Sequence, residues 1–485
     1  MSSKDSREQT SVALKLALVG AGAAAVCAGW KLWRRARLER LNRNLPRGQK
    51  ILIVGAGFAG TNAARELAKL LPRPEHAEIT LVDEDDYQLF TPMLTEAAGG
   101  EIEPRHAVSP LRDLPSRIRF EQGRVVEIDL AKKQVTVENS ANGGGVDKAA
   151  GTGENRRTLA ADHLVIAVGS VPNFHDVPGV AENSLTVKSL GDAAAIRDHV
   201  LEMLERADAE SRADERRDAL TFVVGGGGFT GVETMAAVND LVRASVVRYP
   251  NVGLQDVRAL LVAPEERLLP ELSAELASYA QRQLEARGVE VRLKTKITGA
   301  AEGRVELQGG ERVNTRTLIW AGGVRPSPLV ERLDCRHGDH GGIVVDQCFR
   351  VPGRAGVWAL GDCAEIPKGD SKQTYSPTAQ NATREGRLVA RNIVATMRGD
   401  VPRPFRYRPV GELALVGRRA GVARVYGINF SGLFAWLLWR AVYWAKMPSA
   451  GQRARVLFDW LLDFTFGRPV ASLPAPPPVK PLRAA

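Results

Sequence analysis

The sequence predicts an α/β protein with two parallel-sheet domains, the second inserted into the first, and a helical region at the C-terminal end. Three observations support this fold class. Two unbroken apolar runs each lead into a glycine-rich turn, at residues 51–60 and 220–231. A third apolar run, at residues 356–362, ends in Gly-Asp. A strand followed by an acid this late in the chain indicates that the first domain is completed after the second.

The first glycine-rich turn follows the apolar run Ile51–Val54, which is typical of a buried parallel strand. It contains Gly55, Gly57 and Gly60 and opens a stretch with helical spacing. In this pattern Gly55 permits a tight turn, Gly57 lets the backbone approach a pyrophosphate, and Gly60 lets the helix pack on the strand. The next strand ends at Asp83, whose carboxylate can accept hydrogen bonds from ribose hydroxyls. Together these features predict a Rossmann-like dinucleotide-binding domain.

A second turn of the same kind follows the apolar run at residues 220–224. Its glycines align as Gly226, Gly228 and Gly231, and Glu233 follows at the start of the next helix. One nucleotide-binding fold is common, whereas two in one chain imply two dinucleotides. The sequence therefore predicts a second Rossmann-like dinucleotide-binding domain.

Two later strand ends complete the first domain. Residues 163–169 form a predicted buried strand that ends at Gly169. The run at residues 356–362 ends at Gly361 and Asp362, and an aspartate here can bond a ribityl hydroxyl of a flavin. A helix is then predicted from the segment that begins at residue 375 to about residue 396.

Composition limits the possible partners. The chain has 485 residues, of which 44% are apolar, and a formal net charge of +10. A basic balance favours nucleic acid or an anionic membrane surface. The sequence contains no nucleic-acid-binding module, and many of its aromatic residues lie near the C-terminus, which favours the membrane. The four cysteines form no Cys-x-x-Cys pair, so neither a redox dithiol nor a metal site is predicted: Cys27, Cys335, Cys348 and Cys363.

Residues 12–33 are a candidate membrane anchor. Their uninterrupted apolar part, Leu16–Trp30, is short against the roughly 20 residues that a spanning helix needs. Lys15 and Lys31 could extend it by snorkelling. The basic residues that follow would leave the body of the protein on the cytoplasmic side. A cleaved targeting segment and a soluble helix are the alternatives.

The C-terminal region has a tryptophan-rich apolar segment and an amphipathic segment. Leu433–Ala445 is rich in tryptophan and leucine but too short to span a bilayer. Gln452–Phe466 has one polar face at helical spacing, and its other positions include large apolar residues. We predict that both segments associate with a membrane surface, where tryptophan sits at headgroup level. The alternative is a buried pair of core or dimer helices.

The chain is accordingly divided into six parts. They are an N-terminal tail at 1–48 with the candidate anchor, a first domain in two parts at 49–190 and 341–410, an inserted second domain at 191–340, a membrane-associating or dimerisation region at 411–473, and a disordered tail at 474–485.

With both glycine turns, Gly361-Asp362, the Ala379-Gln380 segment and the tryptophan-rich end, the sequence resembles the type II (non-proton-pumping) NADH:quinone oxidoreductases over about residues 49–470. The resemblance implies FAD on the first domain and NAD(P)H on the second. It further implies a homodimer bound to a membrane. Residues expected to bind the cofactors are Gly55, Gly57, Gly60, Asp83, Gly169, Gly361, Asp362 and Ala379 for FAD, and Gly226, Gly228, Gly231 and Glu233 for the nicotinamide dinucleotide.

The resemblance implies that the flavin carries out the redox chemistry and that the protein holds the flavin in position. Hydride passes from the nicotinamide C4 to the flavin N5, and two electrons then pass to a membrane quinone. Gln380 and Glu385 are expected near the quinone, and Glu233 is expected to shape the nicotinamide pocket or relay a proton. For Glu233 and Gln380, a plain role at a helix N-terminus is the alternative. The expected location is the cytoplasmic face of a bacterial inner membrane, or else the mitochondrial inner membrane.

Two positions depart from the pattern of this family. Ala263 stands where the family has an acid at the end of the second strand of the NADH domain, and Glu385 replaces a glutamine of the flavin-proximal helix. We therefore expect weak discrimination, with NADPH used within roughly 30-fold of NADH, unless Glu265 or Glu266 restores the acid. The replacement by Glu385 leaves the choice between ubiquinone and menaquinone open.

Two rival functions remain at this point. A sulfide:quinone reductase would need paired cysteines beside the flavin, and only Cys335 and Cys348 are distant candidates. A non-catalytic, FAD-holding membrane protein is the other rival. Reduction of the flavin by NADH and its reoxidation by a soluble quinone would separate all three.

Overall fold

The computed structural model describes residues 42, 45–139, 156–369, 371 and 373–471. The predicted anchor at residues 12–33 and the predicted tail at 474–485 lie outside the described residues. In the part of the chain that the structure describes, none of the helices is both long and apolar enough to cross a membrane. The prediction of a transmembrane helix therefore finds no support in these residues.

The first sheet has five parallel strands in the order β21-β9-β1-β2-β5. They are Val357–Ala359, His163–Ile166, Gln49–Val54, Ala77–Asp83 and Ile118–Gln122. β21 comes last in sequence yet pairs with β9, which confirms that the first domain is completed after the second. Helices α2 (Phe58–Leu70) and α10 (Ala379–Arg398) pack so closely that a Cβ on Gly386 would lie 2.2 Å from the carbonyl oxygen of Ala59.

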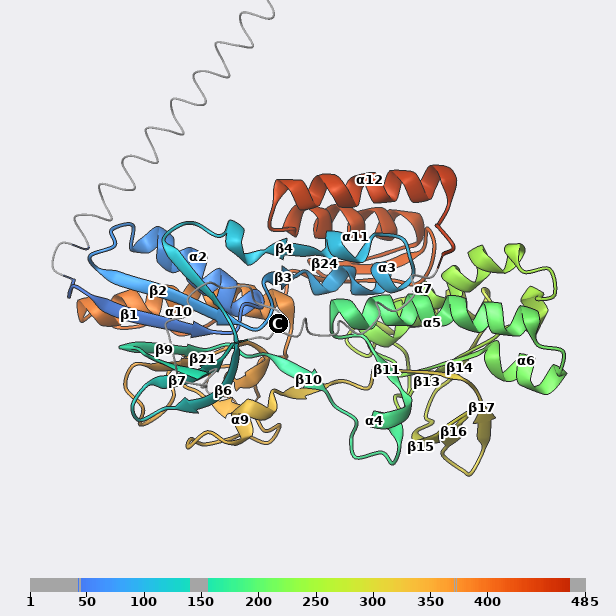
Figure 1. Ribbon diagram of the computed structural model, residues 1–485, viewed down its shortest axis with the longest axis horizontal. Helices are drawn as coiled ribbons and strands as arrows, with labels where there is room; N and C mark the ends of the chain where they lie inside the picture. The colour runs from blue at the N-terminus through green and yellow to red at the C-terminus, as the bar shows by residue number, and fades with distance from the viewer. Residues whose placement is uncertain (1–41, 43–44, 140–155, 370, 372, 472–485) are drawn as a thin grey trace, which may run out of the picture.

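The second sheet repeats this plan, with parallel strands in the order β11-β18-β12-β13-β14. They are Leu185–Thr186, Thr317–Trp320, Thr221–Gly225, Arg258–Val262 and Val289–Arg292. Its helices are α5 (Leu190–Ala209), α6 (Ala213–Ala219), α7 (Phe229–Ser245) and α8 (Ala274–Glu285). A two-stranded antiparallel ribbon of β10 (Ser170–Pro172) and β19 (Val324–Pro326) joins the two domains (Figure 1). The predicted fold class is thus confirmed.

Smaller elements surround the two sheets. Two are antiparallel sheets, β6-β7-β8 (Arg124–Asp129, Gln134–Glu138, Arg156–Ala160) and β15-β16-β17 (Ile297–Ala301, Arg304–Leu307, Arg312–Asn314), and two are strand pairs, β3-β4 (Tyr87–Leu89, Val108–Pro110) and β20-β22 (Ile343–Val344, Ala364–Glu365). The short helices are α3 (Leu94–Ala98), α4 (Val180–Asn183) and α9 (Pro328–Glu331). Single turns of 3-10 helix lie at Thr91–Met93, Pro104–Ala107, Leu111–Asp113, Val246–Arg248, Leu254–Asp256 and Gly361–Cys363.

The C-terminal region is a three-stranded meander followed by two helices. The strands β23 (Gly411–Leu415), β24 (Gly421–Val425) and β25 (Ile428–Ser431) are antiparallel, and α11 (Gly432–Lys446) and α12 (Ala450–Phe466) follow. In Figure 1 both helices form a layer along one side of the molecule, above α3 and α7. One continuous hydrophobic core includes residues of α3, α5, α7, the meander and both terminal helices. The C-terminal region is therefore built onto the second domain rather than tethered to it.

The two terminal helices turn their apolar faces outward. In α12 the buried side chains are Gln452, Val456 and Trp460, whereas Phe458 is 64% exposed. Ser109 Oγ donates a hydrogen bond to Gln452 Oε1 at 2.9 Å, so part of the polar face packs against the body of the protein. The exposed apolar side chains of the pair are Leu433, Phe434, Leu437, Leu457, Phe458, Leu461, Leu462, Phe464 and Phe466. We call this set the outer apolar face.

Candidate active site

The turn between β1 and α2 has the geometry of a phosphate cradle. Gly55 has φ +100°, and a Cβ built on it would lie 2.2 Å from the carbonyl oxygen of Ala167. A Cβ on Gly60 would lie 1.8 Å from the oxygen of Gly55, whereas a Cβ on Gly57 would meet no atom within 4 Å. Gly57 is the N-cap of α2, and no side chain caps this helix. Its first N–H groups therefore face open space that a pyrophosphate fits.

Asp83 ends β2 beside this turn. Its Oδ2 accepts a hydrogen bond from the N–H of Ala56 at 2.5 Å, and its Oδ1 accepts one from the N–H of Asp85 at 3.0 Å. Burial raises the pKa of Asp83 to about 6, although both hydrogen bonds act to lower it. The carboxylate is thus held at the middle residue of the glycine turn, where a ribose hydroxyl can reach it.

The turn between β12 and α7 repeats the cradle. A Cβ on Gly226 would lie 2.4 Å from the oxygen of Ala321, and one on Gly231 would lie 1.9 Å from the oxygen of Gly226. Gly228 is the uncapped N-cap of α7 and has no atom within 4 Å of a built Cβ. Each of the two glycine turns therefore has room for the pyrophosphate of one dinucleotide.

Three of the predicted site residues, Gly361, Asp362 and Glu385, line a cavity of about 680 Å³ beside the ribbon that joins the domains. Asp362 Oδ2 accepts a hydrogen bond from Ser170 Oγ at 2.7 Å and lies 3.7 Å from Lys188 Nζ. The structure thus brings the end of the first domain, its last helix and the interdomain ribbon to one place. The cavity suits the middle of an extended flavin dinucleotide.

Gly169 and Glu385 are both linked to this arrangement, Gly169 through its neighbour Ser170 and Glu385 through Gly361. Gly169 has φ +67°, with no atom within 4 Å of a built Cβ. Glu385 is 2% exposed, and its Oε2 accepts a hydrogen bond from the N–H of Gly361 at 2.9 Å. Burial raises the pKa of Glu385 to about 8, against the effect of that hydrogen bond. Glu385 therefore supports the Gly361-Asp362 corner as a protonated carboxyl at neutral pH.

Ala379 and Gln380 open α10, as predicted for the flavin-proximal helix. Gln380 Nε2 donates to the oxygen of Gly411 at 2.9 Å, and its Oε1 accepts from the Tyr407 hydroxyl at 3.0 Å. The guanidinium of Arg384 lies 4.0 Å from the centre of the Tyr407 ring. Sequence reasoning missed both Tyr407 and Arg384, because neither belongs to a motif.

The structure places Glu233 toward the C-terminal region. Its Oε1 accepts hydrogen bonds from the N–H of Leu415 at 3.0 Å and from Trp439 Nε1 at 3.1 Å. Burial raises the pKa of Glu233 to about 8, and both hydrogen bonds oppose this rise. The carboxyl thus joins the start of α7 to β23 and α11. Its predicted role at the nicotinamide stays a prediction.

Comparison with known proteins decides the family. Residues 49–386 match the pyridine nucleotide-disulphide oxidoreductase family, and residues 410–469 match the NDH2 C-terminal domain. The chain is 30% identical over 390 residues to the type II NADH:quinone oxidoreductase of Staphylococcus aureus, over 79% of this chain and 91% of that protein. This chain belongs to the type II NADH:quinone oxidoreductase family. It is therefore an FAD-dependent enzyme of the NADH:quinone oxidoreductase class, as the sequence predicted.

Other relatives of this type II NADH:quinone oxidoreductase agree. It is 27% identical over 449 residues to the mitochondrial internal alternative NAD(P)H-ubiquinone oxidoreductase A1 of Arabidopsis thaliana, over 87% of this chain and 86% of that protein. In fold alone, NDH2 from Plasmodium falciparum in complex with NADH superposes with a TM-score of 0.78 at 20% identity, covering 88% of this chain and 100% of that chain.

The sulfide:quinone oxidoreductase of Aquifex aeolicus superposes on this type II NADH:quinone oxidoreductase with a TM-score of 0.64 at 17% identity, covering 87% of this chain and 96% of that one, a likeness of fold alone. Within the described residues, Cys335, Cys348 and Cys363 are all unpaired. The sulfide:quinone reductase alternative is not favoured.

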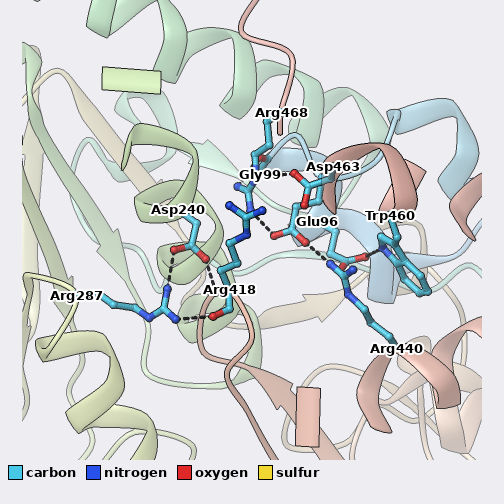
Figure 2. Close-up of polar contacts among 10 residues, drawn as sticks. Glu96, Gly99, Asp240, Arg287, Arg418, Arg440, Trp460, Asp463 and Arg468 are labelled. Carbon is cyan, nitrogen blue, oxygen red and sulfur yellow. Dashed lines mark hydrogen bonds and ion pairs between the residues drawn. The ribbon is translucent and has the colours of Figure 1, made fainter. Parts of the chain in front are cut away.

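A buried ionic network, which the sequence did not predict, fastens the C-terminal helices of this type II NADH:quinone oxidoreductase (Figure 2). Arg440 of α11 lies 3.1 Å from Glu96 Oε1 and 2.6 Å from Glu101 Oε2. Arg468, which follows α12, lies 2.6 Å from Glu101 Oε1. Trp460 Nε1 donates a hydrogen bond to Glu96 Oε2 at 2.9 Å. Residues hundreds of positions apart thus hold the layer of Figure 1 in place.

The two carboxyls of this network titrate in opposite directions. Burial raises the pKa of Glu96 to about 8, although Arg440 lowers it. Burial also acts to raise the pKa of Glu101, but Arg468 and Arg440 together outweigh it, so that this pKa is lowered. Of the two carboxyls, Glu101 is therefore the one whose charged form the arginines favour.

A second group of contacts in Figure 2 joins α7 to the turn between β23 and β24. Arg287 Nη1 lies 2.9 Å from Asp240 Oδ1, and the N–H of Arg418 donates to Asp240 Oδ2 at 2.6 Å. Arg287 Nη2 also donates to the oxygen of Arg418 at 2.6 Å. The helix that carries the second glycine turn at its start is thus anchored to the C-terminal region near its middle.

Proposed function

We propose that this enzyme oxidises NADH at its second domain and reduces a quinone that enters from a lipid bilayer bound by its C-terminal helices. In this proposal residues 49–190 and 341–410 hold FAD, residues 191–340 hold the nicotinamide dinucleotide, and residues 411–473 dock on the membrane. When bound there, FAD would supply the redox chemistry, namely acceptance of a hydride from the nicotinamide and donation of two electrons to the quinone. The polypeptide supplies binding and orientation.

The roles of the predicted residues follow from their positions. The turns at Gly55 and Gly226 receive the two pyrophosphates, Asp83 accepts from the adenosine ribose of FAD, and Asp362 from its ribityl chain. Gln380 and Tyr407, linked by a hydrogen bond at 3.0 Å, offer polar groups to a quinone headgroup at the start of α10. These assignments rest on the geometry of the two glycine turns and on the chemistry of the donors and acceptors.

The outer apolar face supports the membrane part of this proposal. Phe458, Phe464 and Phe466 of α12 are 64%, 65% and 78% exposed, and Phe434 of α11 is 58% exposed. A contiguous apolar face of this kind marks an interaction site on a soluble protein surface. Polar Gln452 of the same helix is buried against the body of the protein, so the apolar side of α12 faces the solvent. The basic balance of +10 adds attraction to anionic lipid.

The membrane proposal is tested by flotation with liposomes that contain anionic lipid. Replacing Phe458 and Leu462 by serine should abolish flotation, while NADH-dependent reduction of a water-soluble quinone stays within about twofold. The matched control is Val247→Ser, because Val247 is 79% exposed and lies in the turn Val246–Arg248 rather than in α11 or α12. Equal flotation of the double variant and the wild type would contradict the proposal.

We further propose that the protein works as a homodimer at the cytoplasmic face of a bacterial inner membrane, the mitochondrial inner membrane being the alternative. The homodimer is the assembly that the resemblance to this family implies, and the exposed apolar side chains of α11 and α12 offer a surface for it. Sedimentation of the detergent-solubilised protein measures the oligomeric state. A single monomer at all concentrations would contradict the dimer and leave the membrane proposal standing.

The catalytic proposal is tested by anaerobic stopped-flow with purified protein refilled with FAD. NADH should bleach the flavin absorbance, and a quinone analogue added next should restore it. Failure of NADH to bleach the bound flavin would contradict the proposal. Sulfide as the better donor would instead select the sulfide:quinone reductase alternative.

A further inference from the structure

The two glycine turns allow an internal comparison that locates the acid missing from the second domain. In the first sheet Val54 pairs with Val82, and the N–H of Gly55 donates to the oxygen of Val82 at 2.8 Å. In the second sheet Gly225 pairs with Val262, and the N–H of Gly226 donates to the oxygen of Val262 at 2.8 Å. Asp83 therefore corresponds in register to Ala263.

Ala263 cannot do what Asp83 does. Asp83 Oδ2 reaches the N–H of Ala56, the residue between the first two glycines of its turn. The matching residue in the second turn is Gly227. A Cβ on Gly227 would lie 2.8 Å from the Cβ of Ala263, and Ala263 is fully buried. In the second domain the position that matches Asp83 is therefore occupied by the methyl group of Ala263, which packs against the turn.

Glu265 brings a carboxylate to the same place from the following loop. Its Oε2 would lie 3.0 Å from a Cβ built on Gly227, so it approaches the turn at the residue that matches Ala56. This oxygen is buried and has no hydrogen-bond partner within the described residues. A buried carboxylate oxygen without a donor is unfavourable, and a ligand hydroxyl would supply the donor.

The loop that carries Glu265 is fixed on both sides. The N–H of Lys294 donates to the oxygen of Glu265 at 3.0 Å, and the N–H of Thr295 donates to the oxygen of Ala263 at 3.1 Å. On the other side the N–H of Leu269 donates to the oxygen of Gly227 at 2.8 Å. The carboxylate is thus positioned before any ligand binds.

The neighbours of Glu265 in this loop have other partners. Glu266 lies 3.0 Å from Lys294 Nζ, and both side chains are exposed. Arg267 Nη2 donates to the oxygen of Pro270 at 3.0 Å. In this segment Lys294 thus pairs with Glu266 and Arg267 bonds a backbone carbonyl, while Glu265 approaches the turn.

We infer that Glu265 is the specificity-determining acid of the second domain, which accepts hydrogen bonds from the adenosine ribose hydroxyls of NADH and excludes the 2′-phosphate of NADPH. A 2′-phosphate would place roughly −1.5 to −2 charges beside this carboxylate and repel it. The enzyme therefore prefers NADH, and the weak discrimination expected from Ala263 alone is replaced by a strong one. This inference rests on the proposed placement of the nicotinamide dinucleotide at the second turn.

The test compares Glu265→Gln with Glu266→Gln in the FAD-loaded enzyme. Two quantities are measured, the kcat/KM of anaerobic flavin reduction by NADH and by NADPH, and the dissociation constants of NAD+ and NADP+ from quenching of tryptophan fluorescence. We expect the wild type to prefer NADH more than about 100-fold in kcat/KM. Glu265→Gln should lower that ratio at least about tenfold and tighten NADP+ relative to NAD+ by a similar factor, whereas Glu266→Gln should leave both within about twofold.

Two results would overturn the inference: a wild-type ratio below about tenfold, or equal shifts in the two variants. An enzyme reduced by neither donor would instead contradict the proposed function, so the two failures are distinguishable. Glu265→Gln keeps the size of the side chain, and its folding is checked by its flavin content and melting temperature. The buried contact of Ala263 with the turn makes Ala263→Glu unsuitable as a test, because the larger side chain has no room there.

Discussion

At the scale of residues, burial decides the protonation of three carboxyls that join separate parts of the chain. Burial raises the pKa of Glu96, Glu233 and Glu385 to about 8 in each case. In an unfolded chain glutamate titrates near about 4.3. Between these pH values the folded protein binds more protons than the unfolded chain. The free energy of unfolding therefore falls as the pH rises through this window.

Replacing Glu385 by glutamine should flatten this pH dependence. The amide oxygen can still accept the hydrogen bond from Gly361, so the corner before Asp362 stays intact. We expect the loss of unfolding free energy between pH 6 and pH 8 to shrink, by at most about 1.4 kcal/mol per pH unit. Urea unfolding at several pH values measures it. The exposed control Glu182→Gln should leave the slope as in the wild type, and an unchanged slope in Glu385→Gln would contradict the expectation.

At the scale of elements, the strand-turn-helix units were predictable and the orientation of α12 was not. The glycine spacing and Asp83 reflect local requirements, because the backbone itself must approach a phosphate there. The amphipathic pattern of α12 gave two faces but could not say which one is buried. That choice depends on polar partners elsewhere in the chain: His106 lies 2.6 Å from Asp459, and Ser109 bonds Gln452. For the same reason Glu265 could not be ranked above Glu266 without the loop geometry.

Two glycines of the first turn should respond differently to substitution. Gly57→Val has open space for its side chain, so we expect a folded protein whose flavin content falls more than about tenfold, because the valine occupies the phosphate cradle. Gly60→Ala places a Cβ 1.8 Å from the oxygen of Gly55, so we expect a lower melting temperature of the protein itself. Flavin absorbance per protein and thermal unfolding of the apoprotein separate the two effects. Full flavin content in Gly57→Val would show that the phosphate binds elsewhere.

At the scale of the whole molecule, the C-terminal helices are part of the second domain's core. Trp439 is buried and bonds Glu233, and Arg440 pairs with Glu96 and Glu101. Deleting α11 and α12 would strip these acids of their partners. Surface substitutions on the outer apolar face are therefore a cleaner way to separate membrane binding from folding.

Arg440→Leu should destabilise the protein by at most about 3–5 kcal/mol, because buried Glu101 loses one of its two arginine partners and keeps only Arg468. The double variant Arg440→Leu/Glu101→Gln should lose less than the sum of the two single variants, because both single changes remove the same Arg440–Glu101 ion pair. Urea unfolding of the wild type, both single variants and the double variant completes the cycle. Strictly additive effects would show that the two side chains do not act together.

This network also predicts that distant positions of the chain change together in evolution. Segment 94–101 and helix α11 lie far apart in sequence, yet they share the buried ion pair between Glu101 and Arg440, so that a change of one residue removes a partner of the other. In related chains the matching positions should therefore change together, from an ion pair to an apolar pair, rather than one at a time. A chimera that takes its C-terminal helices from a relative would have to take the relative's segment 94–101 as well.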